Sequence, residues 1–183
     1  MRNQGRLRLG YFPLPLSEAR RIRACLLYPT SPAMIDPCIG DGAAFLAITA
    51  EACARRYGIE LDAYRAEQAA SVVDELIHGD CLDVHCPVES FGLVFLNPPY
   101  DWAIGEGRNE RMERVFLAHA YRWLKVGGVL VLVVPAQHVC ECGEILASRF
   151  KETRIFGLTD PEAVRYRQVV VLATHRSRRE ANS

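Results

Sequence analysis

The sequence predicts an α/β protein built on a doubly wound, mostly parallel seven-stranded sheet with an antiparallel final strand. Three observations support this fold class. Strand-like and helix-like segments alternate along the chain, which is typical of a parallel sheet covered by helices. Polar side chains follow four successive strand-like segments. Two further strand-like segments close the chain and are predicted to form an antiparallel pair that completes the sheet.

Short apolar runs bounded by turn residues predict the strands. The run at 91–96 is continuous and ends at Asn97. The run at 129–134 is stopped by Pro135, which has no N–H group for a central ladder. In chain order, the predicted strands cover residues 33–36, 57–61, 76–79, 91–96, 129–134, 154–158 and 168–174.

Apolar residues at helical spacing predict the helices. Met112, Phe116 and Trp123 share one face of a helix that is closed by Gly127 and Gly128. The first helix is predicted from the spacing of Phe45, Ile48, Thr49, Ala52 and Cys53. The predicted helices cover residues 43–56, 63–73, 112–123 and 142–149.

The bulk composition suits one globular domain with a hydrophobic core. The chain has 183 residues, of which 50% are hydrophobic and 24% are charged, with a formal net charge of zero. Residues 1–28 nevertheless hold six arginines against one glutamate. We therefore expect a basic N-terminal segment at 1–28, the α/β domain at 29–176 and a polar tail at 177–183. Basic ends favour phosphate contacts, although solvated tails have the same composition.

The cysteine pattern predicts reduced thiols in a cytoplasmic protein. The seven cysteines are odd in number and follow no framework spacing, and the N-terminus does not resemble a signal peptide. The longest apolar stretch, at 129–134, is far shorter than a membrane span. His138, Cys140 and Cys142 lie close together, but their spacing matches no usual zinc pattern, so we expect no bound metal.

Four polar residues mark the edge where a ligand is expected to bind. Asp36, Glu60, Asp80 and Asn97 each stand at the carboxyl end of a successive predicted strand. In a doubly wound sheet these ends share one edge, and ligands bind there. Packing alone does not explain four such positions. The sequence therefore predicts a binding site at this edge.

The segment Asn97-Pro98-Pro99-Tyr100 is the most informative motif of the chain. Two consecutive prolines fix the backbone and remove two N–H donors, which leaves a rigid corner. This corner presents an amide oxygen, backbone carbonyls and an aromatic ring, and a long polar loop at 101–110 follows it. Such groups can accept hydrogen bonds from a planar amino group while the ring stacks on its face. An amine-bearing aromatic or amide substrate is therefore expected.

The segment 36–42, Asp-Pro-Cys-Ile-Gly-Asp-Gly, separates the first predicted strand from the first predicted helix. Its glycines allow the backbone to approach a ligand closely, and the helix N-terminus offers unpaired N–H groups. Glu60 follows Asp36 by 24 residues, a spacing that suits a carboxylate accepting hydrogen bonds from a ribose. Asp80, at the next strand end, is placed to accept a hydrogen bond from an adenine amino group.

The glycines of this loop also fit other interpretations. Gly40 and Gly42 also fit a tight turn without a ligand, and they fit a dinucleotide-binding loop after a strand. In the dinucleotide fingerprint, however, Phe45 would occupy a position that requires a small residue. No Gly-Lys-Ser/Thr sequence follows, so a Walker-type phosphate loop is absent.

Taken together, these motifs resemble those of Rossmann-like S-adenosylmethionine methyltransferases. Residues 36–42 resemble their D-P-x-x-G-x-G loop, and 97–100 match the N-P-P-Y motif of the branch that methylates amino nitrogens, above all adenine N6 in DNA. Residues 10–15 resemble the segment that precedes the glycine loop in the gamma arrangement of adenine methyltransferases. The family often has threonine where Leu14 stands. The resemblance covers roughly residues 10–135.

The resemblance implies a role for each matching residue. The glycine loop would hold the amino-acid part of the cofactor and Glu60 its ribose, while Asp80 would meet the adenine amino group. Tyr11 and Pro13 would close over the methionine end. The residues implied to bind the cofactor are Tyr11, Pro13, Asp36, Pro37, Cys38, Gly40, Gly42, Glu60, Leu61, Asp80, Cys81 and Asn97. Those implied to act on the acceptor are Asn97, Pro98, Pro99 and Tyr100.

The acceptor is less defined than the cofactor. Adenine in DNA is the leading expectation, while an RNA base and a protein glutamine amide are alternatives within the same motif class. A non-catalytic cofactor-binding subunit is the alternative from another class. Adenine-specific DNA methyltransferases usually carry an extra domain that reads the target sequence, for which this chain leaves no room. The expected partners are therefore nucleic acid, with DNA favoured over RNA, and a specificity subunit or a missing target-recognition domain.

Overall fold

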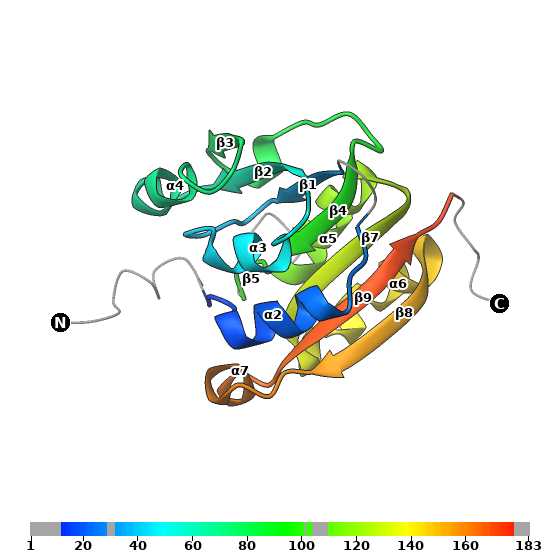
Figure 1. Ribbon diagram of the computed structural model, residues 1–183. Helices are drawn as coiled ribbons and strands as arrows, with labels where there is room; N and C mark the ends of the chain where they lie inside the picture. Colours follow the sequence, from blue (N-terminus) through cyan, green and yellow to red (C-terminus); the bar gives the residue numbers. More distant parts are fainter. Residues whose placement is uncertain (1–11, 29–31, 101, 104–109, 178–183) are drawn as a thin grey trace.

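A computed structural model describes residues 12–28, 32–100, 102–103 and 110–177. Its central sheet consists of β1 (Ala33–Asp36), β2 (Arg55–Glu60), β3 (Glu75–His78), β4 (Phe91–Leu96), β7 (Leu124–Pro135), β8 (Phe150–Gly157) and β9 (Gln168–His175). The strands lie in the order β3-β2-β1-β4-β7-β9-β8 (Figure 1). The pairs from β3 to β7 are parallel, and β9 is antiparallel to both β7 and β8. The predicted seven-stranded, mostly parallel sheet with an antiparallel final strand is confirmed.

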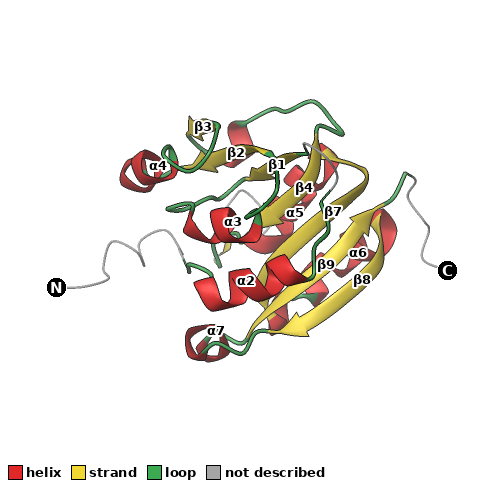
Figure 2. Ribbon diagram, in the orientation of Figure 1, coloured by secondary structure: helices red, strands yellow, loops and turns green. Residues whose placement is uncertain are grey.

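Helices cover both faces of the sheet, which gives three layers (Figure 2). One face carries α2 (Leu16–Ala24), α3 (Ala43–Ile48) and the short α7 (Pro161–Arg165), and the other carries α5 (Met112–Ala120) and α6 (Gly143–Arg149). Helix α4 (Ala63–Ala69) packs beside β2 and β3 at one end of the sheet. Short 3-10 turns occur at Cys81–Asp83, Tyr121–Trp123, Ala136–His138 and Cys140–Cys142, and a hairpin joins β5 (Trp102–Ala103) to β6 (Glu110–Arg111).

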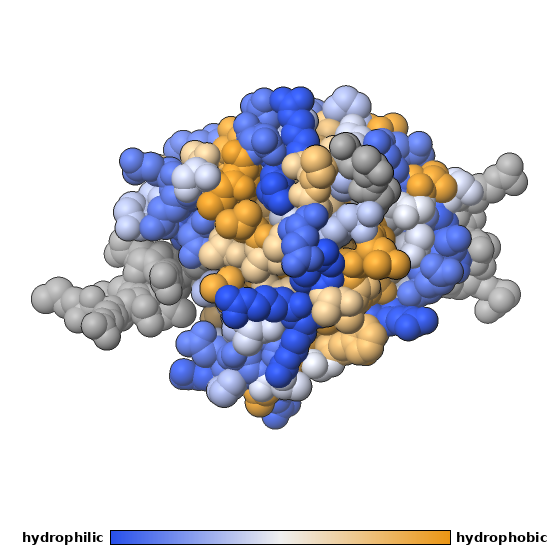
Figure 3. Space-filling model, in the orientation of Figure 1, coloured by the Kyte–Doolittle hydropathy of each residue, from blue (hydrophilic) through white to orange (hydrophobic). Residues whose placement is uncertain are grey.

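Two hydrophobic cores lie on opposite faces of the sheet because successive strand residues point to opposite sides. In β4, Leu93 and Phe95 pack toward α2 and α3, while Val94 and Leu96 pack toward α5 and α6. Strand β7 alternates in the same way. Polar and apolar residues are interspersed on the outer face that carries α2 and α3 (Figure 3).

The first predicted helix is wrong in length. Helix α3 ends at Ile48 rather than continuing to residue 56, and the Thr49 hydroxyl just beyond its end donates to the Phe45 carbonyl oxygen at 2.8 Å. The chain then turns through Glu51 at a positive φ of 65°, a conformation that no α-helix can continue. Strand β2 consequently begins at Arg55, before the predicted start at residue 57.

Other boundaries differ in informative ways. Strand β7 extends back to Leu124 and includes Gly127 at a φ of 78°, and the register of its partner β4 shifts between Phe91 and Leu93. Helix α4 ends at Ala69 rather than at residue 73. Part of the predicted loop 101–110 forms the β5–β6 hairpin, whereas residues 104–109 lie outside the described part.

The sequence analysis did not predict helices α2 and α7. The buried side chains Leu14, Ala19, Ile22 and Leu26 attach α2 and its flanks to the same core as Phe45. Residues 12–28 are thus part of the packed domain. Within the described residues, no helix has the length and apolar character needed to span a bilayer.

Candidate functional site

The parallel strands bring the predicted polar residues to one edge of the sheet. Asp36 and Glu60 are the last residues of β1 and β2, and Asn97 follows β4 directly. Asp80 lies two residues beyond β3 and caps the turn at 81–83 through the backbone N–H of Leu82, at 2.9 Å. Because β1 lies between β2 and β4, the glycine loop that follows it is flanked by Glu60 and Asn97.

Asp36 is a buried carboxyl group at the start of the glycine loop, with a side chain only 1% exposed. One oxygen accepts a hydrogen bond from the backbone N–H of Cys38 at 2.9 Å. Burial raises the pKa of Asp36 well above its usual value; the Cys38 N–H opposes the rise and the negative charge of Glu60 adds to it. A cationic group bound beside Asp36 would reverse this shift.

The glycine loop depends on two backbone conformations with positive φ. Gly40 has a φ of 62°, and its N–H donates to Glu60 Oε2 at 2.8 Å. Gly42 has a φ of 81° and precedes the first residue of α3. A Cβ atom at Gly42 would lie 2.3 Å from Val72 Cγ2, so a side chain here is excluded by both strain and space.

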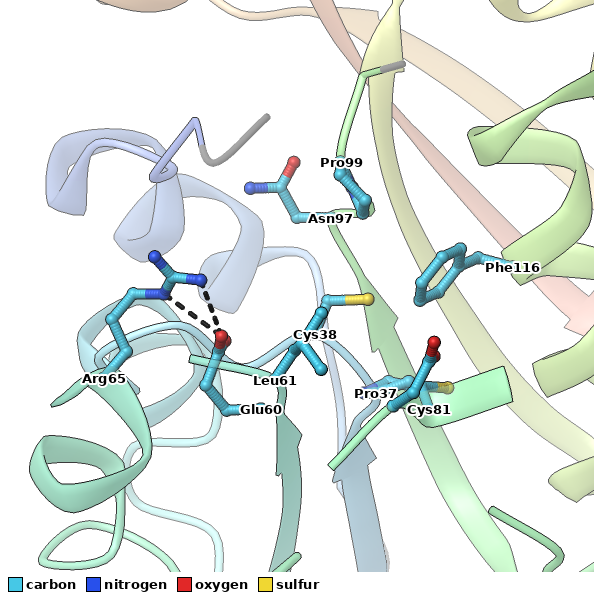
Figure 4. A pocket seen from close by; sticks show the side chains of 10 residues that line it. Pro37, Cys38, Glu60, Leu61, Arg65, Cys81, Asn97, Pro99 and Phe116 are labelled. Carbon is cyan, nitrogen blue, oxygen red and sulfur yellow. Dashed lines mark hydrogen bonds and ion pairs between the residues drawn. The ribbon is translucent and has the colours of Figure 1, made fainter. Parts of the chain in front are cut away.

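Glu60 is held by more donors than the sequence indicated. Its Oε1 accepts from the Asp62 N–H at 2.8 Å and from two nitrogens of the Arg65 guanidinium, Nη2 at 2.7 Å and Nε at 3.1 Å. Figure 4 shows Arg65 reaching from α4 to this carboxylate. Oε2 receives the Gly40 N–H and keeps a second lone pair, because a carboxylate oxygen can accept two hydrogen bonds.

Two adjoining pockets open at this edge and share Cys38 and Asn97. The first encloses about 510 Å³ and is lined by Pro37, Cys38, Glu60, Leu61, Arg65, Asp80, Cys81, Asn97, Pro99 and Phe116. The second encloses about 720 Å³ and is lined by Pro13, Leu14, Pro15, Leu16, Asp36, Cys38, Ile39, Asp41, Ala43, Ala44, Phe95, Asn97 and Glu162.

The first pocket has one polar and one apolar side. In Figure 4 the Glu60–Arg65 pair lies on one side, and Phe116 projects from α5 on the other. This arrangement suits a ligand that joins a sugar to a flat ring. Burial raises the pKa of Cys81 to about 12 and also raises that of Cys38, so neither thiol supplies a thiolate nucleophile near neutral pH.

The asparagine–proline corner is tied into a hydrogen-bond chain. Asn97 Nδ2 donates to the Phe12 carbonyl oxygen at 2.8 Å, and the Tyr100 hydroxyl donates to Asn97 Oδ1 at 2.7 Å. Gln168 Nε2 in turn donates to the Tyr100 oxygen at 2.7 Å. The Phe12 ring stacks on Tyr100, with centroids 5.2 Å apart and planes 11° apart, and Tyr166 packs against Phe12 at 4.6 Å. Burial raises the pKa of Tyr100, so its hydroxyl stays protonated.

The predicted residues are thus distributed around the two pockets, and their roles stay predictions. Pro13 and Asp36 line the second pocket; Pro37, Glu60, Leu61, Asp80, Cys81 and Pro99 line the first; Cys38 and Asn97 line both. Gly40, Gly42, Pro98 and Tyr100 shape the surrounding backbone and corner without lining either pocket. Tyr11 lies outside the described residues.

Four residues at the site were missed by the sequence analysis: Phe12, Arg65, Phe116 and Gln168. Phe12 stands within the recognised segment 10–15, so its presence could have been anticipated. Phe116 was assigned to the core face of its helix, and it does line a pocket from there. Arg65 and Gln168 carry no local sequence signal, because their contacts depend on the tertiary fold.

Comparison with known proteins identifies the family to which the chain is similar. A family model described as an uncharacterised methyltransferase family (DUF6094) matches residues 1–183. No curated protein matches the chain.

Solved methyltransferase structures share the fold at low sequence identity. A putative class I S-adenosylmethionine-dependent methyltransferase from Listeria monocytogenes superposes with a TM-score of 0.76 at 14% identity, over 89% of this chain and 60% of its own. A type I restriction-modification methyltransferase subunit from Streptococcus thermophilus gives 0.71 at 18% identity, over 93% and 46%. An RNA methyltransferase from Salinibacter ruber, in complex with S-adenosyl-L-homocysteine, gives 0.60 at 16% identity, over 93% and 98%. The chain therefore spans less than two thirds of the length of the first two of these neighbours.

Proposed function

The chain belongs to the DUF6094 family of methyltransferases, and from this premise we propose that it transfers a methyl group from S-adenosylmethionine to an exocyclic amino nitrogen. Adenine N6 in DNA is the leading acceptor. The observation that carries the proposal is the position of Asn97, whose amide lines both pockets at the carboxyl edge of the sheet. A group placed there can reach an acceptor beside a cofactor that fills the pockets.

The two pockets fit the parts of S-adenosylmethionine. Glu60 Oε2 has a lone pair for a ribose hydroxyl, and the apolar side near Phe116 suits the adenine ring. The buried Asp36 carboxyl in the second pocket suits the ammonium group of the methionine part. When bound, this cofactor supplies a methyl group that is already activated by its sulfonium. The protein then needs mainly to position the acceptor and polarise it.

Asn97 and Pro98 are proposed to polarise the acceptor amine. An adenine amino nitrogen is a weak nucleophile because its lone pair is delocalised into the ring. The Asn97 side-chain oxygen and the Pro98 carbonyl oxygen would each accept one N–H of that amine. These hydrogen bonds favour a tetrahedral nitrogen whose lone pair is directed toward the donor methyl group.

The aromatic contacts favour a planar ring over an amide as acceptor. The Phe12 ring lies nearly parallel to the Tyr100 ring, 5.2 Å away, so this face of Tyr100 accommodates an aromatic partner. A nucleic-acid base would stack there once the Phe12 side chain alone moves aside, a contact worth about 1–3 kcal/mol. A base within a duplex must first be rotated out of the helix to reach such a site.

Nucleic acid is the partner class that this proposal requires, and DNA is favoured over RNA. The fold similarity to a restriction-modification methyltransferase subunit supports a role for a further specificity subunit or target-recognition domain. An RNA base or a glutamine amide as acceptor, and a non-catalytic cofactor-binding subunit, are the competing functions. A cytoplasmic location also remains part of the proposal.

Calorimetric titration with S-adenosylhomocysteine, with NAD as the control, tests the cofactor assignment. We expect binding of S-adenosylhomocysteine alone. Binding of NAD instead would overturn the methyltransferase assignment in favour of an oxidoreductase.

Transfer of labelled methyl groups to DNA, RNA and protein then tests the acceptor. Asn97→Ala should abolish transfer and retain cofactor binding, whereas Gln68→Ala, an exposed amide on α4, should leave both unchanged. Normal transfer by Asn97→Ala would refute the mechanism. Cofactor binding without transfer to any acceptor would favour the non-catalytic subunit.

A further inference from the structure

Gln168 is a buried polar residue that contacts the acceptor corner from the far end of the chain. It is the first residue of β9 and only 4% exposed. Its side-chain Nε2 lies 2.7 Å from the Tyr100 hydroxyl oxygen, across 68 residues of sequence. A buried amide is retained in a fold only when hydrogen bonds compensate for its desolvation.

The directions of the hydrogen bonds in this chain follow from elementary chemistry. The Phe12 carbonyl oxygen can only accept, so the Asn97 amide must turn its NH2 group toward it. The Asn97 oxygen therefore faces Tyr100, whose hydroxyl must donate its single proton to that oxygen. The Tyr100 oxygen can then only accept, and Gln168 supplies the donor. The Phe12 carbonyl oxygen thus fixes the orientation of the Asn97 amide, and through it the direction of the hydrogen bonds at the Tyr100 hydroxyl and the Gln168 amide.

This arrangement leaves the Asn97 oxygen available in a defined direction. An amide oxygen has two lone pairs, and Tyr100 uses one of them. The other is free to accept an N–H bond from a substrate amine. The same hydroxyl contacts also hold the end of the Tyr100 side chain in place, and a base would stack on its ring.

We infer that Gln168 is a positioning residue for the methyl acceptor, acting through the Tyr100 hydroxyl to orient the Asn97 amide oxygen. The inference rests on the proposed function, and it adds β9 to the elements that build the acceptor site. Gln168 does not line either pocket, so the cofactor does not need it. Its removal should therefore affect the acceptor step and spare cofactor binding.

Gln168→Met keeps the approximate shape of the side chain and removes the donor. We expect kcat for methyl transfer to fall about tenfold, which corresponds to the ~1.4 kcal/mol of one hydrogen bond. The affinity for S-adenosylhomocysteine should stay within about twofold, below the effect of any lost hydrogen bond. If Gln168 only packed the core, its replacement would lower thermal stability but would not lower kcat while leaving the affinity for S-adenosylhomocysteine unchanged.

A double-mutant cycle with Tyr100→Phe tests whether Gln168 affects kcat through the Tyr100 hydroxyl. Tyr100→Phe removes the hydroxyl through which Gln168 acts, so Gln168→Met should cause little further loss of kcat in that background. Equal losses in both backgrounds would overturn the inference. Tyr100→Phe also provides the needed variant if Gln168→Met fails to fold.

A spectroscopic measurement tests the same inference without any acceptor. The side-chain amide resonances of Asn97 in the S-adenosylhomocysteine complex are identified by their loss in Asn97→Ala. Gln168→Met and Tyr100→Phe should both shift these resonances, and the exposed control Gln68→Met should not. Unshifted Asn97 resonances in Gln168→Met would overturn the positioning role. If no acceptor is ever methylated, the proposed function fails, while the resonances still decide whether Gln168 orients Asn97.

Discussion

At the scale of single residues, the ribose assignment depends on a carboxylate that is already largely engaged. Oε1 of Glu60 receives Arg65 and the Asp62 N–H, so only Oε2 remains for a ligand hydroxyl. Glu60→Gln keeps the size of the side chain and removes the charge. We expect it to weaken S-adenosylhomocysteine binding by about 10–100-fold, because hydrogen bonds to a charged group contribute about 1.5–3 kcal/mol. Calorimetry measures this change.

Arg65 supplies a second variant for the same prediction. Arg65→Met removes the guanidinium that fixes Glu60 and should also weaken cofactor binding. The exposed pair between Arg55 of β2 and Glu75 of β3 gives a matched control, since Glu75→Gln disrupts a salt bridge away from both pockets. Unchanged affinity in Glu60→Gln would refute the ribose assignment.

The buried carboxyl of Asp36 predicts a pH dependence of cofactor binding. Its pKa is raised in the unliganded protein, chiefly by burial, so it holds its proton to a higher pH than a free carboxyl. A cofactor ammonium group beside it would favour the ionised form, and binding would then release a proton. We therefore expect affinity for S-adenosylhomocysteine to rise with pH from the bound-state pKa up to the raised pKa of free Asp36, and to level off above it.

Titrations between about pH 5 and 8, in buffers with different ionisation enthalpies, measure this proton release. Asp36→Asn cannot ionise and should remove the pH dependence. An equal slope in Asp36→Asn would assign the effect to another group. The pH dependence of folding stability has the opposite sign. Without cofactor, the native state keeps the proton of Asp36 to a higher pH than the unfolded chain does. The free energy of unfolding should therefore fall as pH rises from the unfolded-state pKa of about 3.9 toward the raised folded-state pKa.

The sequence predicts single residues well only where the backbone topology fixes them. Asp36, Glu60 and Asn97 were placed at this edge because each ends or directly follows a strand and parallel strands share an edge. Arg65 and Gln168 were not, because their partners are set by side-chain reach from α4 and β9. The spacing of apolar residues along the sequence does not indicate which distant side chains will meet.

At the scale of elements, strands were easier to predict than helix ends. Strand β4 matches its predicted bounds because a continuous apolar run meets a proline pair. The first helix was overextended because Ala52 and Cys53 continue the helical spacing of Phe45 and Ile48. The positive φ of Glu51 ends it regardless, since this backbone conformation cannot continue an α-helix.

A buried carboxylate adds to the apolar contacts that hold helix α2 in place, which gives an element-scale prediction. Glu18 is 2% exposed, and its Oε1 accepts from the backbone N–H groups of Thr159, at 2.8 Å, and Asp160, at 2.6 Å. Glu18→Ala leaves these donors without that acceptor and should lower the free energy of unfolding by about 2–4 kcal/mol. Urea denaturation measures the loss.

The control for Glu18→Ala is Glu75→Gln, whose salt bridge with Arg55 is more than half exposed. Exposed ion pairs contribute about 0–1 kcal/mol, so its unfolding midpoint should barely move. Similar destabilisation by both variants would mean that α2 is attached by its apolar face alone. That face includes Ala19 and Ile22.

At the scale of the whole molecule, the proposed cofactor site depends on the complete parallel half of the sheet. Most of its polar residues follow or end β1, β2, β3 and β4, which are separated along the chain by α3 and α4. The alternation of strands and helices was enough to predict this assembly, because parallel strands require helical crossovers. The cofactor should consequently bind the folded chain and not the unfolded one.

This exclusive binding predicts a ligand-dependent stability of the whole fold. At a concentration about 100 times its dissociation constant, S-adenosylhomocysteine should stabilise the protein by about 2.7 kcal/mol and raise the Tm by about 5–10 °C. Asn97→Ala should keep this shift, because its amide is proposed to serve the acceptor, while Glu60→Gln should lose most of it. Differential scanning calorimetry across a concentration series measures the effect. A Tm independent of S-adenosylhomocysteine would mean that the edge formed by β1 to β4 does not hold this cofactor in the isolated chain.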